Sequence, residues 1–134
     1  MILLDTNCCI AIMTARSPQV RERLARALAD GDIAVVPSIV AFELWFGAAN
    51  SDHIEANTKG LRDFLTDFEV LPFDDEDARV AGGIRFDLKR KGTPIGTYDV
   101  LIAAQALRQN ALLVTANVRE FSRVPNLRWE NWEA

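Results

Sequence analysis

The apolar residues of the chain fall into short unbroken runs and into longer segments where they recur every three or four positions. Short unbroken runs are typical of strands that are buried on both faces of a parallel sheet. Such runs predict five strands, at residues 2–4, 33–36, 70–73, 112–115 and 127–130. The segments with helical spacing predict six helices, at residues 6–13, 18–30, 39–47, 54–68, 75–91 and 97–110.

This alternation of strands and helices predicts an α/β fold with three layers, in which helices flank a central, mainly parallel five-stranded sheet. The first strand, Ile2-Leu3-Leu4, has no polar position and therefore belongs in the middle of the sheet. Right-handed crossovers then place the second and fourth strands beside it, which gives the strand order 3-2-1-4-5. No repeat, low-complexity tract or linker interrupts the pattern, so residues 1–134 are expected to form a single domain.

Composition and charge narrow the class of protein. The adjacent Cys8 and Cys9 suit neither a disulfide framework nor a metal knuckle, and we interpret them as reduced thiols of a cytoplasmic protein. No apolar run is long enough for a membrane span or a signal peptide. The net charge of −4 argues against nucleic-acid binding through bulk charge, so a nucleic-acid substrate would require a metal ion or local basic groups. Candidates for phosphate contacts are Arg85, Lys89, Arg90, Lys91, Arg119 and Arg123.

Three acids are expected at one edge of the sheet. Ligands of open parallel sheets bind at the carboxyl ends of the strands, where the strand order reverses. Asp5 directly follows the first strand, Glu43 lies early in the helix after the second, and Asp99 opens the helix that leads to the fourth. Each has an ordinary alternative, because Asp5 and Asp99 can cap helices and Glu43 can reach water or an arginine.

Carboxylates that converge on one crevice repel each other unless a cation lies between them. A set of oxygen ligands without cysteine or histidine selects Mg²⁺ or Mn²⁺. Such ions commonly assist the hydrolysis of phosphate esters, so the three acids indicate metal-dependent chemistry on a phosphate ester.

Four short motifs resemble those of one protein family. They are Asp5-Thr6-Asn7, Ala41-Phe42-Glu43-Leu44, Thr97-Tyr98-Asp99-Val100-Leu101-Ile102-Ala103-Ala104 and Thr115-Ala116-Asn117-Val118-Arg119-Glu120-Phe121. In this order and spacing they are similar to the PIN-domain ribonucleases and, within them, to the VapC toxins of type II toxin–antitoxin pairs. The resemblance covers nearly the whole chain.

The resemblance implies a PIN-like fold and a metal-dependent endoribonuclease with Asp5, Glu43 and Asp99 as ligands of Mg²⁺ or Mn²⁺. Thr6 and Thr115 are then expected to form hydrogen bonds around these ligands. The resemblance also implies a homodimer, an RNA substrate (often a structured RNA such as tRNA) and an antitoxin protein that blocks the site.

The chain departs from the family at one position. Many relatives have an aspartate where this chain has Asn117, which can bind a metal through its carbonyl or orient a water but brings no charge. Glu120, three residues further on, either supplies the missing carboxylate or is a surface acid of a helix. Both residues are therefore candidates for the site, and a second metal ion is left open.

Trp45 and Phe46 exceed what one small helix needs for packing. They either belong to the core or form a surface into which the antitoxin lays an apolar helix face.

Two other functions remain open on the sequence alone. In a phosphoryl-transfer domain Asp5 would be the phosphorylated nucleophile, but haloacid-dehalogenase-type enzymes have a second aspartate where this chain has Asn7. Receiver domains have neighbouring acids and a late lysine, which are not found. A non-catalytic, or non-toxin, RNA-binding module of the same fold would have lost an acid, and Asn117 is the only candidate for that loss.

Overall fold

The computed structural model describes all 134 residues and contains a single five-stranded sheet. The strands are β1 (Ile2–Leu4), β2 (Ala34–Pro37), β3 (Glu69–Leu71), β4 (Leu112–Val114) and β5 (Trp129–Glu130). Their order is β3-β2-β1-β4-β5, and every neighbouring pair is parallel. The predicted fold class and strand order are therefore confirmed.

Strand β1 lies at the centre of the sheet and of the core. Leu3 pairs with Val35 of β2 on one side and with Leu113 of β4 on the other. All three of these side chains are fully buried. The absence of a polar position in β1 thus has the cause expected from the sequence, since neither face of the strand reaches water.

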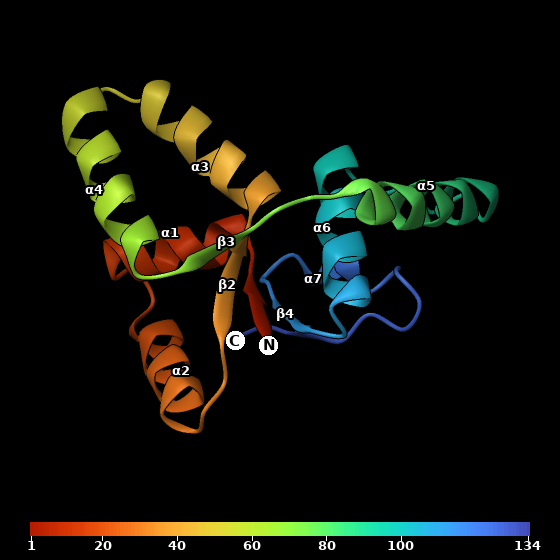
Figure 1. Cartoon of the computed structure of the whole chain (residues 1–134), viewed down its shortest axis with the longest axis horizontal. Helices are drawn as coiled ribbons and strands as arrows, with labels where there is room; N and C mark the ends of the chain where they lie inside the picture. Colours follow the sequence, from red (N-terminus) through yellow and green to blue (C-terminus); the bar gives the residue numbers. More distant parts are fainter.

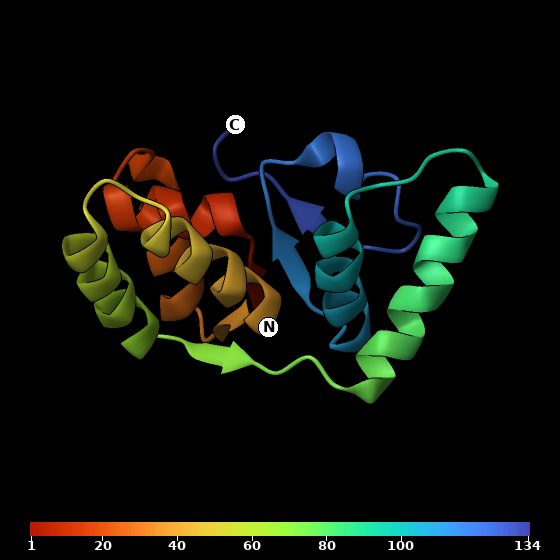
Figure 2. The same ribbon diagram turned by 90° about the horizontal axis from the view of Figure 1, so that it is seen from above.

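Seven helices cover the two faces of the sheet. They are α1 (Thr6–Thr14), α2 (Pro18–Ala29), α3 (Ser38–Ala49), α4 (Ile54–Thr66), α5 (Asp75–Arg90), α6 (Thr97–Arg108) and α7 (Val118–Phe121). Helices α1 to α4 gather on one side of the sheet and α5 to α7 on the other (Figures 1 and 2). Right-handed crossovers require this division, because the chain moves from β1 towards β3 first and only then crosses back to β4 and β5.

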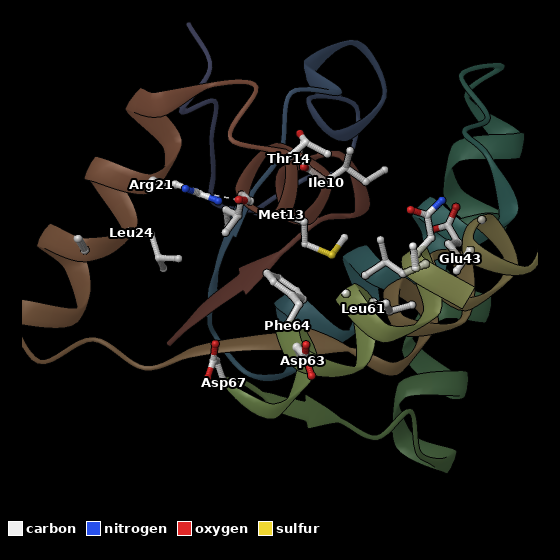
Figure 3. Close-up of a pocket in the computed structure, with 18 of the residues that line it drawn as sticks. Ile10, Met13, Thr14, Arg21, Leu24, Glu43, Leu61, Asp63, Phe64 and Asp67 are labelled. Atoms are coloured by element: carbon white, nitrogen blue, oxygen red, sulfur yellow. Dashed lines mark hydrogen bonds between the residues drawn. The ribbon is translucent and has the colours of Figure 1, made fainter. Parts of the chain in front are cut away.

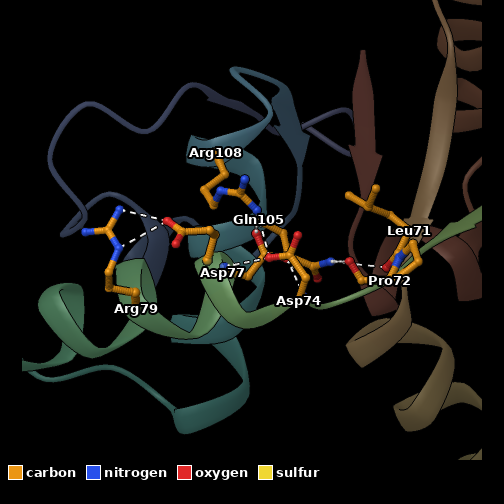
Figure 4. A network of polar contacts seen from close by, with 8 residues as sticks. Leu71, Pro72, Asp74, Asp77, Arg79, Gln105 and Arg108 are labelled. Carbon is orange, nitrogen blue, oxygen red and sulfur yellow. Dashed lines mark hydrogen bonds and ion pairs between the residues drawn. The ribbon is translucent and has the colours of Figure 1, made fainter.

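Strand β3 differs from its predicted position, since it ends at Leu71 and leaves Pro72 and Phe73 outside the sheet. Pro72 has no N–H to donate to a ladder, and β3 is an edge strand with solvent on its free side. The buried side chain of Gln105 holds the C-terminal end of β3, because its Nε2 donates to the carbonyl oxygens of Leu71 and Pro72, each at 3.1 Å (Figure 4).

Two further elements were not predicted as the structure has them. Strand β5 is shorter than expected, with only Trp129 and Glu130 paired to β4. The short helix α7, which carries Glu120, was not predicted as an element of the fold.

Cys8 and Cys9 are both free and buried in α1. None of the helices combines the length and the apolar character that crossing a membrane requires.

Candidate active site

The site begins at Asp5, where the chain leaves β1 and enters α1. Its carboxylate is buried and caps α1, because Oδ1 accepts a hydrogen bond from the Thr6 N–H at 2.6 Å. Its other oxygen, Oδ2, accepts a hydrogen bond from Thr115 Oγ1 at 2.6 Å. Asp5 is therefore a helix cap, as its alternative interpretation expected, and is also linked to the end of β4. Burial raises the pKa of Asp5, and its two hydrogen bonds oppose that rise.

Glu43 reaches the same place from α3. Its Oε1 accepts a hydrogen bond from Thr6 Oγ1 at 2.9 Å, and the side chain is half-buried. No arginine or lysine forms an ion pair with it, so the structure does not contain the arginine partner that the ordinary alternative allowed besides water.

Thr115 and Asn117 continue the network beyond β4. Thr115 Oγ1 donates to Asp5 and accepts from the Asn117 backbone N–H at 2.9 Å, which fixes the direction of both bonds. The Asn117 side chain then donates through Nδ2 to Asp99 Oδ2 at 3.2 Å and to Glu120 Oε2 at 3.3 Å. Asn117 thus faces the acids with its amide N–H groups rather than with its carbonyl oxygen.

The structure brings together all seven residues that the sequence singled out. A continuous chain of hydrogen bonds joins them, and we call this group the carboxylate site; its members are Asp5, Thr6, Glu43, Asp99, Thr115, Asn117 and Glu120. It lies outside the carboxyl ends of β1 and β4. These two strands are neighbours in the sheet, and the strand order reverses between them.

The carboxyl groups of Asp99 and Glu120 shift each other's pKa in opposite directions within the carboxylate site. Burial raises the pKa of Asp99 to about 8, together with a hydrogen bond to Glu120 and the negative charges of Glu120, Asp5 and Glu43. Hydrogen bonds from Asp99, from the Gly96 N–H and from Asn117 lower the pKa of Glu120. Asp99 is therefore the weaker acid of the two and keeps its proton to a higher pH than an ordinary aspartate. Asp99 accepts no hydrogen bond from a backbone N–H of α6, unlike a capping residue.

The donor set of the carboxylate site fits a hard divalent cation in its chemistry. No three acidic, histidine or cysteine side chains stand at the spacing of ligands to one ion. The donors are nevertheless all oxygen atoms, and burial, together with repulsion from the neighbouring acids, raises the pKa of Asp99. A divalent cation relieves the same repulsion, and oxygen donors suit Mg²⁺ and Mn²⁺.

Sequence reasoning missed Gly96, which was assigned only to a loop. A Cβ atom at this position would lie 3.3 Å from Asp99 Oδ2 and 3.6 Å from Glu120 Oε2, so the two carboxyls use the space that glycine leaves. Gly96 also lines a hollow of about 530 Å³, which we call the acidic hollow, together with Glu43, Thr97, Tyr98 and Asp99. The available signal was a glycine directly before the helix that carries Asp99.

A larger groove of about 830 Å³ opens between α1, α2, α3 and α4. Figure 3 shows Met13 and Phe64 near its centre, Glu43 towards one end and Arg21 towards the other. From α3 it is lined by Leu44, Gly47 and Ala48 in addition to Glu43.

Trp45 and Phe46 lie on another side of α3 from this groove and do not line it. Their exposed fractions are 38% and 62%, so the interpretation that placed them in the core is wrong.

Comparison with known proteins identifies the class that this fold and this site define. The model of the PIN domain family matches residues 2–127, and the chain belongs to that family. It is 38% identical over 130 residues to the tRNA(fMet)-specific endonuclease VapC of Salmonella typhimurium, which covers 97% of this chain and 96% of the relative. It is 37% identical to Ribonuclease VapC2 of Rickettsia felis over 131 residues, or 98% of this chain and 97% of the relative.

These relatives place the chain among the VapC ribonucleases, as the four motifs predicted. The crystal structure of VapBC2 from Rickettsia felis, bound to a DNA fragment from its promoter, superposes with a TM-score of 0.91. That comparison covers 98% of this chain and 99% of the other at 37% identity. The structure of VapBC from Salmonella typhimurium bound to DNA gives a TM-score of 0.90 at 38% identity. The phosphoryl-transfer alternatives therefore do not apply.

Proposed function

We propose that this endoribonuclease, the toxin of a toxin–antitoxin pair, hydrolyses RNA with Mg²⁺ or Mn²⁺ held by Asp5, Glu43 and Asp99. The observation that carries the proposal is the chain of hydrogen bonds that joins all seven candidate residues where the strand order reverses. We further propose that residues 1–134 act as one domain.

A bound divalent ion would supply an activated water and neutralise the charge that develops on the phosphate. The residues of this chain prepare the site for it. Thr115 and the Thr6 N–H hold both oxygens of Asp5, and the Thr6 hydroxyl orients Glu43. Asp99 must release its proton to act as a ligand, because a metal ligand binds in its ionised form. The Asn117 side chain donates to both Asp99 and Glu120, and its neutral amide makes this part of the site a weak binder of any second ion.

The RNA substrate requires positive charge near an acidic site. Arg85 and Lys89 lie one helical turn apart on α5 and line a hollow of about 250 Å³ together with Thr97. Thr97 also lines the acidic hollow, so the two hollows adjoin. Neither basic residue forms an ion pair, which leaves both available for phosphates on either side of the bond that is cut. A structured RNA such as tRNA is the proposed substrate class, by analogy with the Salmonella relative, and it would place the activity in the cytoplasm.

The proposed antitoxin occupies the groove between α1, α2, α3 and α4. Its apolar lining suits the apolar face of a helix. Because Glu43 lies towards one end of the groove, a basic side chain of the antitoxin can extend from it to the carboxylate site (Figure 3). The exposed pair of Trp45 and Phe46 then remains as the apolar surface for the proposed homodimer.

Cleavage of a purified tRNA pool tests the metal mechanism. We expect cleavage with Mg²⁺ or Mn²⁺ and none after addition of EDTA. Asp5→Asn should lower the rate at least about 100-fold, because the ion supplies several kcal/mol of charge stabilisation. Asp87→Asn, an exposed acid of α5 without an ion pair, is the matched control and should keep wild-type activity. Undiminished cleavage in EDTA would contradict the mechanism.

A further inference from the structure

We infer that Phe42 and Tyr98 form a stacking site for one unpaired base of the RNA, next to the bond that is cut. The inference rests on the proposed function and names how the substrate is held. Phe42 directly precedes Glu43 in α3, and Tyr98 directly precedes Asp99 in α6. Two of the proposed metal ligands thus have an aromatic residue directly before them in the sequence.

The two rings meet although their helices are distant in the sequence. Their centroids are 5.5 Å apart and their planes are inclined at 68°, an edge-to-face arrangement. In such a pair, the ring that contributes its edge keeps both of its faces free of its partner. Phe42 is 51% exposed and Tyr98 is 46% exposed, so a large part of each ring faces solvent.

Tyr98 also connects this pair to the carboxylate site. It lines the acidic hollow together with Glu43 and Asp99, so a nucleotide that enters the hollow meets the tyrosine and the two carboxylates at once. A base that lies on the aromatic pair therefore has its own phosphates near the proposed metal ligands.

The charge of the protein explains why a stacking contact is needed. The net charge is −4, and none of the four acids of the carboxylate site forms an ion pair, so attraction to phosphates alone is weak. Stacking on an aromatic side chain does not depend on charge and accepts any base. Only an unpaired base offers a free face, which directs cleavage to loops, bulges and single strands.

A second copy of the chain is a less suitable occupant of this pair. A protein surface that covered Tyr98 would also cover the acidic hollow, which the substrate must enter. Trp45 and Phe46 lie further along α3 and offer apolar surface that does not line the hollow.

The test compares leucine with aromatic replacements, because leucine keeps apolar bulk but cannot stack. The variants are Phe42→Leu, Tyr98→Leu, Phe42→Tyr and Tyr98→Phe, with Phe86→Leu, an exposed phenylalanine of α5, as the control. KM and kcat are measured on an RNA hairpin with 2-aminopurine in its loop and on a fully paired duplex of the same sequence. Melting curves and sedimentation are recorded for each variant.

We expect each leucine variant to raise KM for the hairpin about tenfold, the size of one lost base stack, and to change kcat less than about twofold. Both aromatic variants and Phe86→Leu should keep the wild-type KM, and wild type should cleave the duplex poorly. Quenching of 2-aminopurine on binding should be lost in Tyr98→Leu.

Three results overturn the inference: leucine variants with wild-type KM, aromatic variants as impaired as leucine variants, or a changed oligomeric state in the leucine variants. The last result would assign the pair to a protein interface. If Phe42→Leu does not fold, the KM of Tyr98→Leu and its 2-aminopurine quenching test the inference on their own. A wild type that cleaves no RNA would instead refute the proposed function, so the two failures are distinguishable.

Discussion

Helix α6 has a group of acidic side chains at each end, and the two groups differ in how their charge is balanced. At its C-terminal end, Arg108 donates to Asp74 Oδ1 at 2.8 Å and to Asp77 Oδ1 at 3.0 Å (Figure 4). Asp74 and Asp77 also form the capping box of α5, in which each carboxylate accepts the other's backbone N–H. The N–H of Asp77 and the guanidinium of Arg108 lower the pKa of Asp74. Groups of the protein itself, two backbone N–H groups and one guanidinium, thus balance the charge of these acids.

At the N-terminal end of α6, the acids face one another instead. Asp99 lies near Glu120, Asp5 and Glu43, and its pKa rises to about 8. No lysine or arginine forms an ion pair with any of them. Both groups of acids accept hydrogen bonds from the chain, but only the group beside Arg108 also has a cation of the protein. Acids without such a cation form a candidate site for an external cation.

The largest change in stability is expected at the C-terminal end of α6, where Arg108 pairs with the acids. Arg108→Gln leaves the buried Asp77 without its cation, although the capping box keeps one hydrogen bond to it. Breaking a buried pair costs about 3–5 kcal/mol, and we expect about 2–3 here because the arginine is partly exposed. Urea unfolding measures this loss. Arg79→Gln breaks an exposed pair on α5, the helix that carries Asp77, and should change stability by less than about 1 kcal/mol. Equal losses in the two variants would contradict the comparison.

A gain in stability, rather than a loss, is expected from a substitution at the N-terminal end of α6. Asp99→Asn should stabilise the metal-free protein, because it removes one of the acids that repel each other. In the folded state Asp99 keeps its proton up to about pH 8, whereas an unperturbed aspartate releases it near 3.8. Wild type therefore loses stability as the pH rises from about 4 to about 8, and below about 4 both states are protonated and the penalty vanishes. Solvent screening reduces the effect to about 1–2 kcal/mol.

Melting curves across this pH range measure the effect, with and without Mg²⁺. The advantage of Asp99→Asn should be largest at pH 8 and absent near pH 4. Mg²⁺ should raise the melting temperature of wild type and affect the variant less, since a ligand that binds only the folded state stabilises it by RT ln(1 + [L]/Kd). A variant that is less stable than wild type at pH 8 would show that Asp99 acts as an ordinary helix acid.

The features that could be predicted from the sequence are those that a local pattern of residues determines. The unbroken run Ile2-Leu3-Leu4 predicted a central strand, and the position of Asp5 after it predicted the edge where the acids meet. The direction of the Asn117 amide and the contact between Phe42 and Tyr98 depend on helices that meet only in the folded protein. No local pattern encodes them.

The buried face of α3 is the clearest case of a feature that the sequence does not predict. The sequence has apolar residues around nearly the whole helix, so it does not say which face is buried. In the structure Val40, Ala41 and Leu44 are buried in the core, which leaves Trp45 and Phe46 outside. The buried face depends on how the helix packs against the sheet and its neighbours.

The smallest effect is expected from one charge added to the carboxylate site. Asn117→Asp replaces the amide that donates to Asp99 and Glu120 with a further carboxylate facing both. The metal-free protein should lose about 1 kcal/mol at neutral pH, because two hydrogen bonds are lost and a like charge is added. Mn²⁺ should bind about tenfold more tightly, and titration calorimetry measures that change. Asn126→Asp, in an exposed turn before β5, adds the same charge away from the carboxylate site and should change neither quantity. If both variants bind Mn²⁺ like wild type, Asn117 lies beyond the reach of the ion, and its role is confined to holding Asp99 and Glu120 together.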